Sequence, residues 1–433
     1  MSSNEFEMAG KGSRSPVVII FLTIIFSLPF GSNEPMHLLM YIVFLLAFPV
    51  YVFFSSRKAP FSVLSELKKN SPATFYCLLL FAISSVISWL RVILGDVGIE
   101  QKILSSLRYV ICWFLAFYSF MLVRFFRIHH VSIESFFMAI VYGTWASIVL
   151  FFVFYFFLDA PNASSWAVYP PIGGNIRIVG MTISVALLAC ISALWVGKYS
   201  IKQTLVLYLS VFAMSAYLLW TGSRMSLFVS IFSIILLAVL CRLWLRLAWS
   251  RVLAVFVLLL LSIPVSDSLA LPWGGLQKVV DKTSVANVEP GERLEKVGNL
   301  RVQVWTAAAK AIKEKPLLGH GPFGYLFYAH KTPDFEHTHS LIFEVFLEWG
   351  FIGGSLFFAF LLTLAVKGLQ NAKQQFQRRN VGWVMAASTV LVLTLTGLTD
   401  GTYFVMLPSF ILATAFTVFP LQHAHLADES VNP

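Results

Sequence analysis

Apolar residues form long, separate runs along almost the whole chain, and polar residues are confined mainly to the connections between them. An α-helix needs about 20 mainly apolar residues to cross the hydrocarbon core of a bilayer, and most runs approach that length. A transmembrane β-barrel would instead show segments of about ten residues with alternating polarity. The pattern therefore predicts an all-α polytopic membrane protein with about 12 transmembrane helices. The approximate limits of the runs are 17–31, 37–54, 73–93, 103–123, 134–158, 179–197, 204–220, 225–241, 252–270, 341–366, 381–399 and 404–421.

The composition agrees with this membrane class. Of the 433 residues, 58% are hydrophobic and only 12% are charged, whereas soluble domains average about 25% charged residues. Ordinary soluble enzymes and disordered chains are thereby excluded. We interpret the net charge of +10 as loop charge that sets the orientation in the membrane. It does not indicate a nucleic-acid partner.

Basic residues are distributed unevenly between alternate connections. The N-terminal segment and the connections on its side carry 17 Lys and Arg, whereas the short connections on the opposite side carry 3. Because cytoplasmic loops are enriched in Lys and Arg, this bias predicts that both termini and the basic connections are cytoplasmic. The basic connections are 55–72, 124–130, 198–203, 242–251 and 367–380.

One connection, 271–340, is much longer than the others, and we expect it on the outer side. We predict one transmembrane domain over residues 1–433 with this loop inserted in it. The loop carries nine Lys and Arg, but long translocated segments do not obey the charge rule. Apolar residues at helical spacing, followed by a proline, predict a helix over 301–315. We expect this helix to cover the outer opening of the membrane domain.

Arginines gather where the predicted helices meet the outer surface. They are Arg91, Arg108, Arg177 and Arg224. Ionisable residues at membrane depth are costly and often functional, so each is a candidate for binding an anionic substrate. The alternative is that these long side chains reach the lipid headgroups, or that Arg91 and Arg108 form structural pairs.

Two histidines, His337 and His339, lie at the end of the long loop, next to the apolar run that begins at 341. Histidine titrates near neutral pH and therefore suits general acid–base catalysis. A His-x-His pair also occurs in metal sites, but these need three or four ligands. No Cys or Asp cluster accompanies the pair in the sequence, so we expect no metal and no cofactor.

Carboxylates follow these histidines. Glu344 and Glu348 lie four residues apart and share one face of a helix. A buried carboxylate needs a partner or a proton, so this pair is expected to bind arginines, to orient His339, or to be purely structural. Asp400, at the outer end of a later run, is a third candidate of the same kind.

Three stretches of the sequence contain motifs that occur together in one order. The first is a His-Ser pair, nine further residues and a Gly-x-x-Gly motif. The second is an Arg-x-x-x-Trp motif followed by Pro-x-x-Gly-x-Gly. The third is a Ser-Arg pair at the start of a run. In this chain they are His339-Ser340 with Gly350 and Gly353, then Arg301 and Trp305 with Pro316, Gly319 and Gly321, and Ser223-Arg224.

Together, these three stretches resemble the O-antigen ligase and polymerase family of bacterial envelope glycosyltransferases. This resemblance implies an O-antigen ligase of the bacterial inner membrane with a periplasmic active site. The implied donor is a glycan linked to undecaprenyl diphosphate, and the implied acceptor is a sugar hydroxyl of lipid A-core. The family's functional histidine and two arginines correspond to His339, Arg224 and Arg301. We expect His339 to act as a general base and the arginines to bind the diphosphate, in a metal-independent, inverting transfer. Arg177, Arg91, Arg108, His337, Glu344 and Asp400 are candidates for substrate binding.

Alternatives remain at this stage. A polymerase of the same family would use another lipid-linked glycan as acceptor. A transporter or flippase would use the arginines to bind an anionic lipid-linked substrate in passage, but the sequence lacks a clear internal repeat. A structural scaffold would leave the outer arginines and histidines without a purpose.

Overall fold

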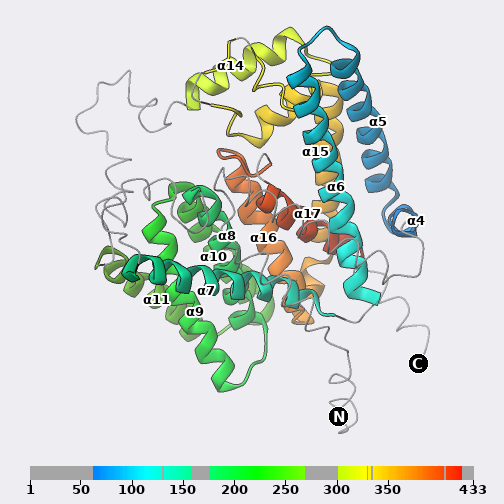
Figure 1. Cartoon of the computed structure of the whole chain (residues 1–433). Helices are drawn as coiled ribbons and strands as arrows, with labels where there is room; N and C mark the ends of the chain where they lie inside the picture. The colour runs from blue at the N-terminus through cyan, green and yellow to red at the C-terminus, as the bar shows by residue number, and fades with distance from the viewer. Residues whose placement is uncertain are drawn as a thin grey trace. The chain divides into compact units, whose positions relative to one another are not determined.

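The computed structural model describes residues 62–128, 131–157, 175–268, 301–328, 330–332, 335–403 and 406–421. All regular secondary structure in these residues is helical (Figure 1). The helices are α4 (Ser62–Asn70), α5 (Pro72–Leu94), α6 (Ile99–Ile128), α7 (Ile133–Phe157), α8 (Ile176–Val196), α9 (Ile201–Thr221), α10 (Arg224–Leu245), α11 (Trp249–Ser268), α14 (Arg301–Glu314), α15 (Leu341–Gln377), α16 (Val381–Gly397) and α17 (Met406–Leu421).

The predicted apolar runs coincide with helices wherever the structure describes them. Eight described helices are long and apolar enough to cross a membrane. They confirm an all-α, multi-pass membrane protein. Helices α16 and α17 also coincide with predicted runs, but with 17 and 16 residues they are shorter than the others. The first two runs, 17–31 and 37–54, lie outside the described residues, so the total of twelve spans stays a prediction.

The chain divides into two compact units. The first unit comprises residues 1–60, 120–277 and 371–392, and its described part contains α7 to α11. The second unit comprises residues 61–119, 278–370 and 393–433, and contains α4, α5, α14 and α17. Helices α6, α15 and α16 contribute residues to both units.

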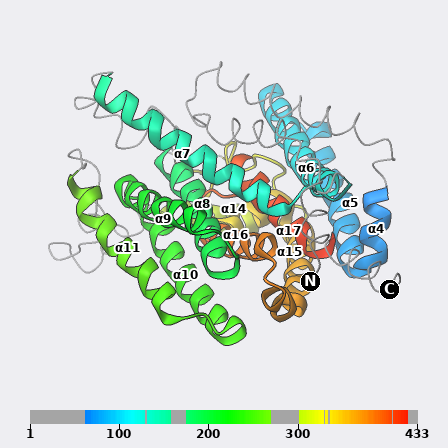
Figure 2. The same ribbon diagram turned by 90° about the horizontal axis from the view of Figure 1, so that it is seen from below.

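Helix α8 is the central helix of the first unit. It packs against α7, α9 and α10, as Figure 2 shows. Nearly all of its residues are buried, as expected of a helix that is apolar on every side. At Gly180 the neighbouring helix comes so close that an added Cβ would lie 2.8 Å from the Cβ of Ser223. A small residue is therefore required where α8 meets the start of α10.

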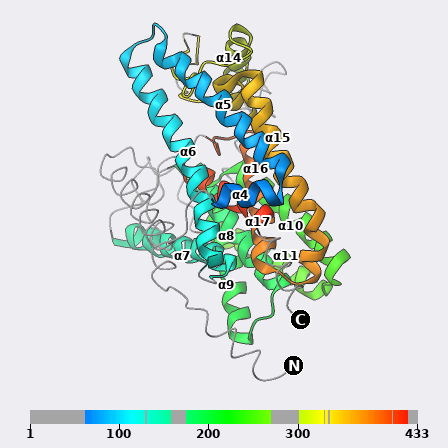
Figure 3. The ribbon, with the colours of Figure 1, turned by 90° about the vertical axis from the view of Figure 1, so that its right-hand side faces the viewer.

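In the second unit, α5 lies between α6 and α15 (Figure 3). The indole nitrogen of Trp89 on α5 donates to the hydroxyl of Ser106 on α6 over 3.1 Å. The hydroxyl of Ser88 donates to the carbonyl of Glu348 on α15 over 3.1 Å. Phe81 on α5 forms an apolar cluster with buried residues of α15, among them Trp349. Aromatic packing and serine hydrogen bonds thus join these three helices.

Helix α15 is interrupted at Gly350, which the sequence pattern did not predict. This residue has φ 65° and ψ −172°, a conformation that favours glycine. The interruption releases two carbonyls from the helix. That of Leu347 accepts from the backbone N–H of His320 over 2.6 Å, and that of Glu348 accepts from Gly321 over 2.9 Å. The loop before α15 is thereby attached to the helix backbone.

The helix predicted over 301–315 is confirmed as α14, Arg301–Glu314. Its apolar face packs against the loop that follows it and against α15, through Val304, Ala308, Tyr325 and Leu347. Of the long predicted connection, residues 269–300 lie outside the described part of the chain. The placement of this loop over the outer membrane opening stays a prediction.

Candidate functional site

His339 lies in a tight turn immediately before α15. Its φ of 52° is uncommon for a residue with a side chain, and such backbone conformations gather at functional sites. The backbone N–H of His339 donates to Nδ1 of His337 over 3.2 Å, and the two rings lie 4.0 Å apart. The two histidine rings therefore lie side by side.

Asp400 contacts both of the catalytic candidates in the second unit. Its Oδ1 lies 3.5 Å from Nδ1 of His339, and its Oδ2 lies 3.8 Å from a terminal nitrogen of Arg301. The backbone N–H of Gly401 donates to Oδ1 over 2.9 Å, which fixes the carboxylate in the turn after α16. One buried carboxylate thus joins a histidine and an arginine that are distant in the sequence.

The Arg-x-x-x-Trp motif has a geometric explanation. Arg301 and Trp305 are four residues apart on α14 and therefore lie on one face of it. The indole nitrogen of Trp305 donates to the carbonyl of Thr338 over 3.1 Å, and its ring stacks on Phe343. The tryptophan attaches α14 beside the turn that carries His339, while the arginine reaches Asp400.

Glu344 also stabilises the turn that carries His339. Both the backbone N–H and the hydroxyl of Thr338 donate to Oε2 of Glu344, over 2.8 and 2.7 Å. The other carboxylate oxygen is buried and has no hydrogen-bond partner. Glu344 therefore supports the backbone next to His339, whereas the carboxylate that contacts the His339 ring is Asp400. Sequence reasoning did not single out Thr338.

Arg108 and Glu348 form a buried pair. The guanidinium Nε lies 3.6 Å from Oε1 of Glu348, and both side chains are almost fully buried. Arg108 donates to the carbonyl of Tyr403 over 3.1 Å, and the Tyr403 hydroxyl donates to Glu348 over 3.1 Å. Burial raises the pKa of Tyr403, with the Glu348 charge adding to the effect, so this phenol stays neutral. Sequence reasoning considered structural pairing for Arg108 but did not include Tyr403.

Arg91 supports the glycine-rich loop. Its guanidinium donates to the carbonyl of Gly319. Gly319 has φ 68°, and an added Cβ there would lie 2.5 Å from the backbone nitrogen of Gly350. The Pro-x-x-Gly-x-Gly and Gly-x-x-Gly motifs therefore mark one close contact between two backbones. Burial lowers the pKa of the nearby His320, so its ring is uncharged near neutral pH.

Arg177 and Arg224 belong to the first unit. Arg177 is in the first turn of α8 and Arg224 is the first residue of α10. Their charges interact with one another, so the start of α10 and the start of α8 present two neighbouring cations. Ser223, before Arg224, donates its hydroxyl to that of Ser226 over 2.9 Å. The structure thus brings together His339, Arg301, Asp400 and His337 in one unit, and Arg177 with Arg224 in the other.

No group of three or more His, Cys, Asp and Glu side chains among the described residues has the arrangement of a metal site. The four cysteines are free, and Cys190 and Cys241 are buried.

Residues 209–358 match the family model described as O-antigen ligase. No curated protein matches the chain. The matched stretch includes Arg224, Arg301 and His339, together with the glycine contact between Gly319 and Gly350. Through this stretch, the multi-pass membrane protein described above is similar to the O-antigen ligase family.

Proposed function

We propose that this protein transfers an O-antigen glycan from undecaprenyl diphosphate to a sugar hydroxyl of lipid A-core. The reaction takes place on the periplasmic face of the bacterial inner membrane and needs no metal ion. The observation that carries the proposal is the position of Asp400, 3.5 Å from His339 and 3.8 Å from Arg301. A base held by a carboxylate, beside a permanent cation, is suited to glycosyl transfer from a diphosphate.

His339 is the proposed general base. With Nδ1 directed at Asp400, its Nε2 is the nitrogen left to take the proton of the acceptor hydroxyl. Asp400 keeps the ring in this orientation and stabilises the imidazolium that forms. General base catalysis of this kind commonly contributes about 10²–10⁴-fold to a rate.

Arg301 is the proposed electrostatic partner of the leaving group. Arginine stays protonated and binds phosphate oxygens through two parallel hydrogen bonds. Cations that are already in position when charge develops on the leaving group lower the barrier by several kcal/mol. By family resemblance, Arg224 is a second proposed phosphate-binding residue, with Arg177 as its cationic neighbour.

In the proposed step, the acceptor oxygen forms a bond to the anomeric carbon while the bond from that carbon to the phosphate oxygen breaks. The hydroxyl proton passes to His339, and undecaprenyl diphosphate leaves as an anion. A single displacement inverts the anomeric configuration. The energy comes from the diphosphate linkage, so no nucleotide or other cofactor is required.

The other candidate residues have narrower proposed roles. His337, next to His339, remains a proposed substrate-binding residue. The contacts of Arg91 with Gly319, of Arg108 with Glu348 and of Glu344 with Thr338 favour supporting roles for these three over direct substrate contact.

The test is glycan transfer by the full chain reconstituted in liposomes with purified undecaprenyl-diphosphate-linked glycan and lipid A-core. We expect His339→Ala and Arg301→Ala to insert normally and to lose transfer. The matched controls are His330→Ala and Lys310→Ala, which remove the same kinds of side chain from exposed positions. Retained transfer by either site variant would remove that residue from the catalytic set.

The same assay separates the ligase from a polymerase of the same family. A ligase consumes lipid A-core and leaves glycan length unchanged. A polymerase instead joins two lipid-linked glycans when lipid A-core is omitted. Movement of the lipid-linked glycan across the bilayer with no new glycosidic bond would support a transporter and contradict the proposal.

A further inference from the structure

The first unit contains a cavity of about 460 Å³ whose wall is strongly basic. Its lining comes from the connections α8–α9 and α10–α11 and from the turn between α15 and α16. Four cations line it: Lys198, Arg246, Arg251 and Arg379. The described lining residues include no Asp or Glu, so the charged side chains of the wall itself are all positive.

The cavity is far from Arg177 and Arg224, the two candidate arginines of the same unit. Arg177 lies at the beginning of α8, whereas Trp195, which lines the cavity, lies at its end. A rise of 1.5 Å per residue separates them by about 27 Å, close to the thickness of the hydrocarbon core. The cavity therefore faces the side of the membrane that the charge count predicts to be cytoplasmic.

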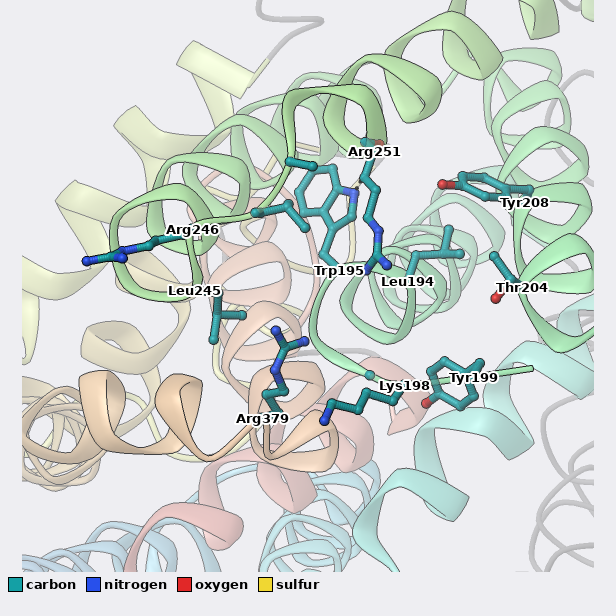
Figure 4. Close-up of a pocket in the computed structure, with 13 residues that line it drawn as sticks. Leu194, Trp195, Lys198, Tyr199, Thr204, Tyr208, Leu245, Arg246, Arg251 and Arg379 are labelled. Atoms are coloured by element: carbon teal, nitrogen blue, oxygen red, sulfur yellow. Dashed lines mark hydrogen bonds between the residues drawn. The ribbon is translucent and has the colours of Figure 1, made fainter. Parts of the chain in front are cut away.

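Side chains converge on this cavity from different helices, as Figure 4 shows. Arg251 and Arg379 extend from opposite sides toward Trp195, and Lys198 lies beside Arg379, whereas Arg246 points away from the other three. Tyr208 and Thr204 lie on the α9 side, and both have hydroxyl groups that can donate hydrogen bonds.

The backbone around the cavity is fixed by hydrogen bonds. A guanidinium nitrogen of Arg379 donates to the carbonyl of Val196 over 3.2 Å, and Arg379 itself has φ 56°. The indole nitrogen of Trp195 donates to the carbonyl of Arg251 over 3.4 Å. Glu134, which does not line the cavity, accepts from the hydroxyl of the lining residue Tyr199 over 2.5 Å. The Glu134 carboxylate is therefore bonded to a tyrosine of the wall and not to one of the four cations.

We infer that this cavity binds the phosphate of an anionic phospholipid headgroup, such as phosphatidylglycerol, from the leaflet opposite Arg177 and Arg224. Guanidinium groups bind a phosphate diester through paired hydrogen bonds. Basic pockets between transmembrane helices on the cytoplasmic side are suited to such headgroups. The volume is within the range of about 300–1,000 Å³ that is typical of small-ligand sites.

The test uses the full chain in a neutral detergent and measures lipid adducts by native mass spectrometry and the shift in melting temperature. We expect phosphatidylglycerol to bind more tightly than phosphatidylcholine with the same acyl chains. Arg251→Gln and Lys198→Gln should each weaken phosphatidylglycerol binding about fivefold, because one basic residue near a lipid phosphate is worth about that factor. The matched control is Lys202→Gln, an exposed lysine in the first turn of α9 that does not line the cavity.

Three results would overturn the inference. Equal binding of phosphatidylcholine would show that the phosphate charge is not recognised. An equal loss of binding in Lys202→Gln would show general surface charge instead of a site. Displacement of the lipid by millimolar inorganic phosphate or glycerol phosphate would identify a soluble phosphate ligand and contradict the lipid assignment.

Discussion

Asp400→Asn tests the proposed mechanism most directly. The substitution keeps the size of the side chain, and the amide oxygen still accepts the backbone N–H of Gly401, so the turn after α16 is retained. It removes the negative charge that lies beside His339 and Arg301. We therefore expect the protein to insert and fold normally, and to lose the orientation and stabilisation of the His339 ring.

The size of the effect follows from the distance. A unit negative charge 3.5 Å from the protonated ring is worth about 5 kcal/mol at an effective dielectric constant of about 20. The dipole of the new amide and the surrounding water recover part of this energy. A net loss of about 3–5 kcal/mol corresponds to a fall in kcat of about 10²–10⁴-fold.

The assay is single-turnover glycan transfer in liposomes, with the melting temperature of the purified protein as a check on folding. Glu100→Gln is the matched control, because it removes one carboxylate from an exposed position in the first turn of α6. The double variant His339→Ala with Asp400→Asn should be no slower than His339→Ala alone, since residues that act as one unit do not give additive losses.

The reasoning fails if Asp400→Asn transfers glycan at the normal rate with the fold intact. It also fails if the two losses multiply in the double variant, because Asp400 would then act independently of His339. A loss of transfer in Glu100→Gln of the same size would show a general effect of charge on the membrane domain.

Two further predictions concern the contacts of Trp305 and Gly319, and a third concerns metal ions. Trp305→Phe keeps the ring stacking but removes the hydrogen bond to Thr338, so we expect about 1 kcal/mol of lost stability and slower transfer. Gly319→Ala should lower the melting temperature, because its Cβ would lie 2.5 Å from backbone atoms and overpacking costs about 1–3 kcal/mol. Gly98→Ala is its control, with nothing within 4 Å. Transfer should continue in excess EDTA, and a loss reversed by added Mg²⁺ would refute the metal-free mechanism.

Helix positions were predictable from the sequence because the length of an apolar run can be read directly from the residues of that run. The run at 179–197 is apolar on every side, and the structure has α8 there, buried by its neighbours. The helix at 301–315 was predictable because its apolar residues recur at helical spacing and a proline ends it. In both cases the stretch itself contains the cause of the structure.

The break in α15 was not predictable in this way. Gly350 stands in an apolar stretch that has the length of a span, and a glycine within a helix is usually tolerated at a cost of about 1 kcal/mol. The helix opens because Pro316 and Leu317 supply carbonyls to Phe351 and Ile352, over 2.7 and 3.2 Å. These acceptors lie more than 30 residues earlier in the chain, so the residues around Gly350 do not by themselves predict the contact.

The candidate site was also only partly predictable from the sequence. Residue chemistry and motif spacing singled out His339 and Arg301, and the sequence offered Glu344, Glu348 and Asp400 as acids that could meet them without deciding which one does. By sequence distance, Glu344, five residues after His339, was a better candidate than Asp400. In the structure Thr338 occupies one oxygen of Glu344, and the turn after α16 brings Asp400 to the His339 ring instead. Which acid meets the histidine depends on tertiary packing, which spacing along one helix does not determine.

The structure explains the spacing between the motifs of this chain. Helix α14 and the first nine residues of α15 run side by side in the same direction, joined through Val304 and Leu347. At one end, Trp305 bonds to the carbonyl of Thr338. At the other, the backbones at Gly319 and Gly350 meet. Since one residue turns an α-helix by about 100° and lengthens it by 1.5 Å, a change in the length of either helix alone would separate one of these contacts. The spacers between the motifs therefore set the distance from the glycine contact to the turn that carries His339, even though no chemistry is proposed for their own side chains.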